Sequence, residues 1–224
     1  KLLESSDILN LPKTAYLNIV NNFMESNNMQ GIVYISDFEK GTILPQIVEI
    51  LLKTKVPNIL ENPIGTYDQL MNNMSALLVI SQNDSSINPR GFFMSKEDDI
   101  KSLIRILFTK FIITKEYCNQ MLIDCNLILQ KYKIHINNFN VDWDDGTNFV
   151  ALLNFVSNGT INFPPTVKLN INVLKDLFIK ANCISILEDD SIFENVDEFV
   201  ISYQIKLIFD EIKKRNLNIP KKND

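Results

Sequence analysis

The stretch that decides the fold is Asp142-Trp-Asp-Asp-Gly146-Thr147, which is followed by an apolar run over residues 149–156. The same pattern stands 105 residues earlier, as Asp37-Phe-Glu-Lys-Gly41-Thr42 ahead of an apolar run over residues 43–52. Solenoid units recur about every 20 to 50 residues, so a repeat near half the chain length predicts two similar domains in tandem instead.

Helical periodicity flanks both copies of this box. Apolar residues recur at helical spacing before each box, along residues 16–23 and 118–132, and again along residues 100–111 and 201–212. The last two stripes each follow a pair of acidic residues, which favour the first turn of a helix. Strand patterns are nearly absent. We therefore predict an all-α protein of two four-helix units.

Composition and charge narrow the classes of function. With 22 basic and 27 acidic side chains the net charge is −5, which argues against wrapping nucleic acid through bulk charge. No apolar run approaches the roughly 20 residues that span a bilayer, and no signal-peptide pattern opens the chain. Cys118, Cys125 and Cys183 form no CxxC pair, which is typical of reduced thiols. We expect a cytoplasmic protein without membrane insertion.

Catalytic and metal-binding motifs are mostly excluded. Six scattered glycines build no phosphate-binding loop, and the single histidine, His135, removes paired-histidine zinc sites. Residues 142–153 do not match a calcium loop, because Gly146 comes one place early and Leu153 stands where a bidentate Glu is needed. The acidic run 188–190 fits a solvated loop better than a cation site. We expect no enzyme, no cofactor and no metal.

Three ordered boxes in the second copy carry a family resemblance. They are Asn138-Phe-Asn-x-x-Trp143-x-Asp-Gly-x-x-Phe149-x-Ala-Leu-Leu153, Ile184-x-x-Leu187-Glu-Asp-Asp190 and Asn195-Val-Asp-Glu-x-x-Ile201-Ser-Tyr203. In order and spacing they resemble the second domain of tandem calponin-homology actin-binding regions. Trp143 and Tyr203 are assigned to the core, and Gly146 to an unusual backbone angle before the core helix.

The first copy resembles the first domain of the same family. It carries Ile35-x-Asp37-Phe-x-x-Gly41-x-x-Leu44 and Lys101-Ser-Leu-Ile-Arg-Ile-Leu-Phe108-Thr109. Phe108 stands at the place of a family Trp, and Arg105 replaces a small glycine. The resemblance implies two calponin-homology-like bundles of four main helices each, over residues 12–113 and 115–215.

The resemblance implies a function and a partner as well. It implies an F-actin-binding module of a cytoskeletal cross-linker of the filamin, α-actinin or spectrin type, located at the cytoskeleton. Filamentous actin is the expected partner, and any homodimer is expected only through regions outside this chain. The alternative is a tandem calponin-homology adaptor that has lost actin and contacts another protein or tubulin. Phe108 and Arg105 in the expected contact helix are the features that separate the two.

The family points to three binding helices: the first and last of the first copy, and the first of the second copy. The candidate residues on their polar sides are Lys13, Leu17, Asn21, Met24, Lys101, Arg105, Lys110, Lys115, Asn119 and Gln120. Lys101 and Arg105, four residues apart, are expected to project together away from the core. Basic groups beside exposed apolar groups suit the acidic surface of an actin filament. Each residue alone also fits an ordinary solvated helix face, so the prediction rests on the whole set.

Overall fold

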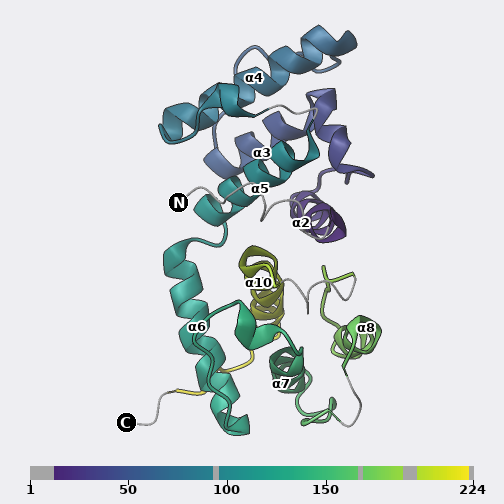
Figure 1. The fold of residues 1–224 in the computed structure, drawn as a ribbon, viewed down its shortest axis with the longest axis vertical. Coiled ribbons are helices and arrows are strands. Elements are labelled where there is room, and N and C mark those ends of the chain that lie inside the picture. Colours follow the sequence, from purple (N-terminus) through teal and green to yellow (C-terminus); the bar gives the residue numbers. More distant parts are fainter. Residues whose placement is uncertain (1–12, 93–95, 166–168, 189–195, 222–224) are drawn as a thin grey trace. The chain divides into compact units, whose positions relative to one another are not determined.

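The computed structural model describes residues 13–92, 96–165, 169–188 and 196–221 (Figure 1). These residues form α-helices and short 3₁₀-helices, and no strand occurs among them, which confirms the all-α prediction. None of the helices within these ranges is long and apolar enough to cross a membrane. The chain divides into two compact units, Tyr16–Leu107 and the part from Phe108 onward with residues 13–15. The division falls inside α5, whereas the predicted boundary lies in the turn after that helix.

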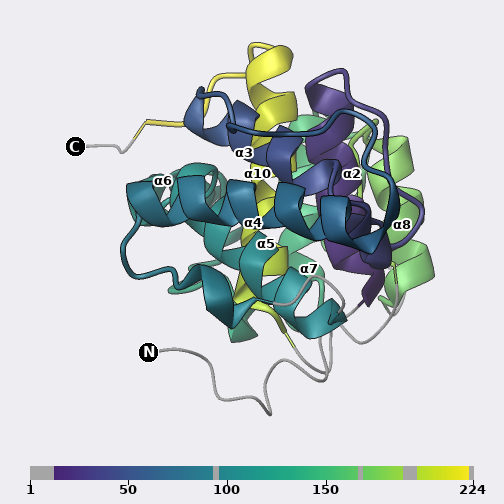
Figure 2. The ribbon, with the colours of Figure 1, turned by 90° about the horizontal axis from the view of Figure 1, so that it is seen from above.

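The first unit is built around contacts among α3, α4 and a short 3₁₀-helix. Its elements are α2 (Lys13–Ser26), η1 (Ile35–Lys40), α3 (Ile43–Leu52), α4 (Gly65–Asn83), η2 (Pro89–Gly91) and α5 (Glu97–Phe111). α3 and α4 lie side by side, and η1 contacts both (Figures 1 and 2). Phe38 from η1, Leu44 from α3 and Ile80 from α4 are fully buried. The box at residues 37–42 therefore directs the chain from η1 into the core of this unit.

The second unit is organised by α7. Its elements are α6 (Lys115–Leu129), η3 (Gln130–Tyr132), η4 (Val141–Trp143), α7 (Thr147–Val156), α8 (Ile171–Lys180) and α10 (Glu198–Lys214). α7 contacts α6, α8 and α10, and nearly every one of its residues is buried. The prediction of a core helix after the box is confirmed, since a helix that is apolar on all sides is stable only when neighbours enclose it.

Trp143 anchors the box of the second unit to this core helix. Its ring centroid lies 4.8 Å from that of Phe149 on α7, and its indole Nε1–H donates to the carbonyl of Asn138 at 3.0 Å. Trp143 is 1% exposed and Tyr203 is 2% exposed. Gly146 precedes α7 with a φ of 74°. The assignments of these three residues to the fold are confirmed.

Left-handed backbone residues recur at the same interval as the sequence repeat. Three pairs stand 105 positions apart, each at a helix end, with φ between 51° and 74°: Asn28 and Lys133, Gly41 and Gly146, and Lys53 and Asn158. Such residues start or stop helices because they reverse the direction of the chain. The two units thus share these three helix ends as well as their boxes.

An asparagine clamp also recurs at this interval, at Asn21 on α2 and Asn126 on α6. The Asn21 side chain accepts from the N–H of Ile32 at 2.7 Å and donates to its carbonyl at 3.0 Å. Asn126 makes the same two bonds to Ile136, both at 2.9 Å. Each clamp ties the loop before a box to the first helix of its copy. The loop's backbone groups are thereby paired without a strand.

Candidate protein-binding surface

The first predicted binding helix, α2, contributes little exposed surface. Met24 is 1% exposed, and Leu17 is half-buried. The prediction of an exposed Met24 is wrong, because Met24 lies one turn after Val20 and continues its buried stripe. Asn21 is half-buried and engaged in the clamp. Lys13 opens α2, and its side chain lies outside the described residues.

The second predicted helix, α5, does not present Lys101 and Arg105 together to solvent. Lys101 is 2% exposed, and its Nζ pairs with a carboxylate oxygen of Glu97, one turn earlier, at 3.1 Å. Arg105 is half-buried, whereas Lys110 is exposed. The prediction of a shared exposed side is wrong for Lys101, because a lysine can bury its alkyl stem while its ammonium stays paired.

Phe108 faces the core, as its place in the apolar stripe of α5 predicts. It is fully buried, and its ring centroid lies 6.0 Å from that of Tyr203. Phe108 therefore packs against Tyr203 of α10.

The third predicted helix, α6, brings its three candidates onto exposed surface. Thr114 caps the helix, its hydroxyl oxygen accepting from the N–H of Tyr117 at 3.2 Å. Lys115, Asn119 and Gln120 are all exposed. Ile123, which sequence reasoning missed, is 55% exposed and follows Asn119 by four residues. Lys115, Asn119 and Ile123 are spaced four residues apart, so a cation, an amide and an apolar side chain lie on one face of the helix. We call Lys115, Asn119, Gln120 and Ile123 the α6 row.

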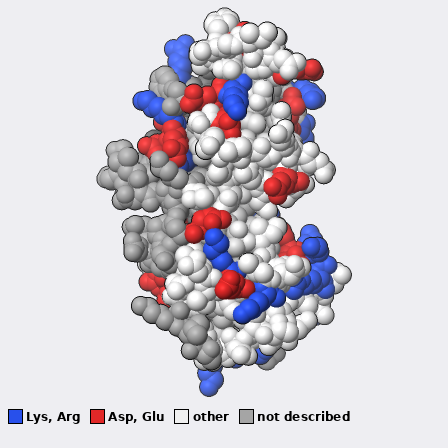
Figure 3. All heavy atoms as spheres, turned by 90° about the vertical axis from the view of Figure 1, so that its right-hand side faces the viewer, with Lys and Arg blue, Asp and Glu red and all other residues white. Residues whose placement is uncertain are grey.

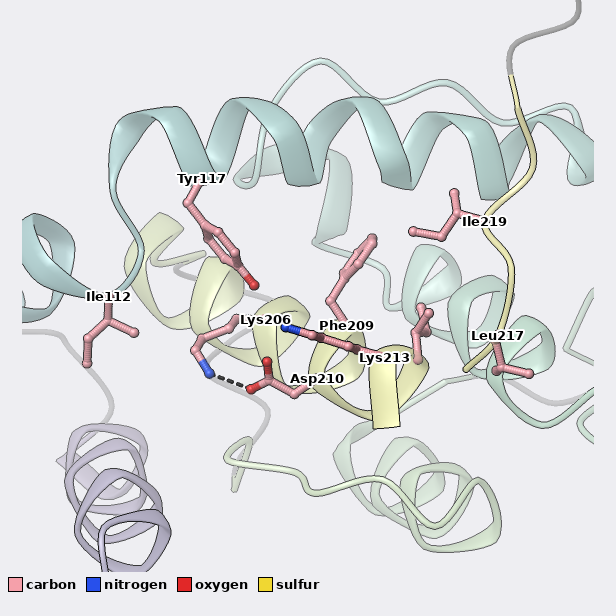
Figure 4. Close-up of a pocket in the computed structure, with 9 residues that line it drawn as sticks. Ile112, Tyr117, Lys206, Phe209, Asp210, Lys213, Leu217 and Ile219 are labelled. Atoms are coloured by element: carbon pink, nitrogen blue, oxygen red, sulfur yellow. Dashed lines mark hydrogen bonds and ion pairs between the residues drawn. The ribbon is translucent and has the colours of Figure 1, made fainter. Parts of the chain in front are cut away.

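A pocket of about 480 Å³ opens next to the start of α6, within the second unit (Figure 4). Its walls come from the turn before α6, from α6 and α10, and from the segment that follows α10. The apolar lining consists of Ile112, Phe209, Ile212, Leu217 and Ile219, and the polar lining of Tyr117, Lys206, Asp210 and Lys213. No sequence motif marks this pocket, because its walls come from segments about 90 residues apart in the chain. The only local signal is the four-residue spacing of Lys206 and Asp210 on α10.

The polar side of the pocket is arranged around an ion pair. Lys206 pairs with Asp210, and the Tyr117 ring lies near both (Figure 4). Burial, together with the negative charge of Asp210, raises the pKa of Tyr117 to about 12. The Tyr117 hydroxyl therefore stays protonated at neutral pH and can donate a hydrogen bond. This arrangement suits an apolar side chain of a partner bordered by polar groups, and it holds no nucleophile paired with a base.

Charges are mixed over the surface. Figure 3 shows basic and acidic side chains interspersed over one face of the molecule. Several basic groups are already paired, as in the contact of Lys175 with Glu188 at 2.8 Å. Any attraction of an acidic partner must therefore come from local basic groups, such as Lys110 at the end of α5 and Lys115 at the start of α6.

The acidic residues within the described ranges form no candidate metal site. No group of three or more His, Cys, Asp or Glu side chains within the described ranges is placed to hold an ion. Glu188 from the acidic run is paired with Lys175, and Asp189 and Asp190 lie outside the described residues.

Comparison of the sequence with models of known protein families finds no match, and comparison with curated proteins finds none.

Proposed function

We propose that this chain is a filamentous-actin-binding module made of two calponin-homology-like domains, and that it acts without a cofactor in the cytoskeleton. The first domain covers residues 12–113 and the second residues 115–215, each with four main helices. The proposal is supported by the recurrence of the box, the left-handed residues and the clamp asparagines at one interval. Such agreement at several levels supports two similar domains in tandem.

The observation that carries the binding proposal is the α6 row together with Lys110. Of the ten sequence candidates, Lys110, Lys115, Asn119 and Gln120 are exposed. The added Ile123 supplies an apolar contact in the same face. Cations around an exposed apolar group suit an acidic filament, because the charges steer the encounter and the apolar group excludes water.

Co-sedimentation with actin filaments tests this proposal through matched charge reversals. Lys110→Glu with Lys115→Glu should weaken binding at least tenfold, because two attractions to an acidic surface become repulsions. Lys131→Glu with Lys180→Glu changes the net charge equally at two other exposed positions of the second unit. This control should bind like the parent chain. Equal weakening by both pairs would show a bulk charge effect and would remove the α6 row from the contact.

A second candidate function follows from the burial of Met24 and Lys101. Two expected contacts are then lost from the first copy, which favours an adaptor that binds another protein or tubulin. Absence of co-sedimentation of the parent chain at tens of micromolar, where modest interfaces still register, would select this candidate.

A further inference from the structure

The helix α4 exposes a row of large apolar side chains in the first unit. Ile64, just before the helix, is 86% exposed, and Tyr67 is 73% exposed. Leu70, Met71 and Leu78 follow at 56%, 43% and 49%. Scattered single apolar residues are normal on a protein surface, but a contiguous patch of this kind marks an interaction site.

The exposed residues follow a regular pattern. Ile64, Tyr67, Met71, Met74 and Leu78 are spaced alternately by three and four residues, which is the spacing of the seam between two paired helices. Met74 is half-buried. We call these five residues the α4 stripe.

The α4 stripe is not the side of α4 that packs into its own unit. That side is formed by buried residues of the same helix, including Asn73, Ala76, Leu77 and Ile80. Through it α4 contacts α3 and η1, and Asn73 donates to the carbonyl of Phe38 at 2.9 Å. The helix therefore has one side that is buried within its unit and a second, apolar side that is exposed to solvent.

The charge of α4 selects the kind of partner. Asp68 is the only charged residue between Gly65 and Asn83, and its carboxylate accepts from the N–H of Ile64 at 3.0 Å. A face without Lys, Arg or Glu offers nothing for a charged partner to complement. Two identical faces of this kind would not repel each other, so electrostatic repulsion does not oppose self-association through them.

The stripe and the neighbouring Leu70 together expose enough apolar area for a pair of identical chains. If each large side chain has roughly 200 Å² of surface, the exposed fractions of Ile64, Tyr67, Leu70, Met71 and Leu78 leave about 600 Å² of apolar area per chain. Two copies would then bury about 1,200 Å², the lower end of the range for specific interfaces.

We propose that α4 is a homodimer interface in which two copies pair antiparallel about a twofold axis close to Met71. The other four members stand at −7, −4, +3 and +7 from this residue, so the stripe is nearly symmetric about it. Ile64 then meets Leu78 of a second copy, and Tyr67 lies within one residue of the level of its Met74. Met71 then faces its own equivalent. This interface lies within the chain, in contrast to the expectation of dimerisation only through other regions, and it does not depend on actin binding.

Sedimentation equilibrium of the full chain, from about 1 µM to about 500 µM, measures the self-association. The parent chain should show a reversible monomer–dimer equilibrium. Met71→Glu places two carboxylates against each other at the axis and should raise the dimer Kd at least tenfold. Ile179→Glu is the control, because Ile179 is an equally apolar residue of α8 that is 74% exposed. Far-UV circular dichroism checks that both variants fold.

Oxidative cross-linking tests the register independently of any effect on folding. Met71→Cys should give a disulfide-linked dimer, whereas Tyr67→Cys alone should cross-link poorly, because its partner position is Met74. The native thiols set a low background, since Cys125 and Cys183 are buried and Cys118 is half-buried. A parent chain that stays monomeric throughout would overturn the proposal and leave the stripe to a different protein. Dimers that resist Met71→Glu, or that Ile179→Glu weakens equally, would overturn it as well.

Discussion

Replacement of Asn126 by Ala removes only a few side-chain atoms, but it should destabilise the second unit substantially. The change removes both bonds of the clamp and leaves the N–H and the carbonyl of Ile136 without their partner. Ile136 is 1% exposed, so water cannot easily replace the lost bonds. Each orphaned group costs about 1–3 kcal/mol. Alanine returns about 0.5 kcal/mol through its higher helix propensity. The expected loss in the free energy of unfolding is about 2–5 kcal/mol.

Urea unfolding followed by tryptophan fluorescence measures this loss directly. Trp143 is the only tryptophan of the chain and lies buried in the same unit, so its emission reports on the affected region. Asn119→Ala, at an exposed position of the same helix, gains the same helix propensity without breaking a clamp. It should leave stability unchanged or raise it by about 0.5 kcal/mol. If the two variants differ by less than about 1 kcal/mol, the clamp does not stabilise the unit and the reasoning is refuted.

Three further changes are expected to have measurable effects. Trp143→Ala should cost about 3–5 kcal/mol, as large aromatic truncations in cores do, and should lower the melting temperature in far-UV circular dichroism. Gly41→Ala should cost at least about 2 kcal/mol, because φ is 70° and the new Cβ would lie 2.5 Å from the carbonyl oxygen of Gln69, whereas Gly91→Ala meets open space and should melt like the parent. Tyr117 ionises near pH 10 when unfolded and near pH 12 when folded, so stability falls as pH rises through this window. Tyr117→Phe should lessen that fall in alkaline urea titrations.

The core of the second unit was predictable from the sequence because its signals are local. The box, the all-apolar helix after it and Trp143 are adjacent in the chain, and burial of that helix follows from its composition. The asparagine clamps were not predicted, since each joins residues about ten positions apart through side-chain geometry. Asn21 and Asn126 stand 105 residues apart, which is the interval of the sequence repeat, and this spacing was the signal that would have revealed them.

The exposure of the candidate binding residues was predicted only in part. The α6 candidates are exposed as expected, because that helix keeps its polar residues away from Met121 and Cys125, which are buried. Lys101 could not be placed correctly from its type, since its burial depends on pairing with Glu97. The pocket had no sequence signal beyond the spacing of two residues on α10.

The left-handed residues at the helix ends leave room to raise the thermal stability of this protein. Helices commonly end with glycine in this conformation, yet Lys53 and Lys133 occupy it with φ of 51° and 60°. A residue with a Cβ pays about 1–2 kcal/mol there. Glycine avoids that strain but loses about 0.4–1 kcal/mol through the greater freedom of the unfolded chain. Glycine at either position would therefore make the protein more heat-resistant without touching the α6 row or the α4 stripe.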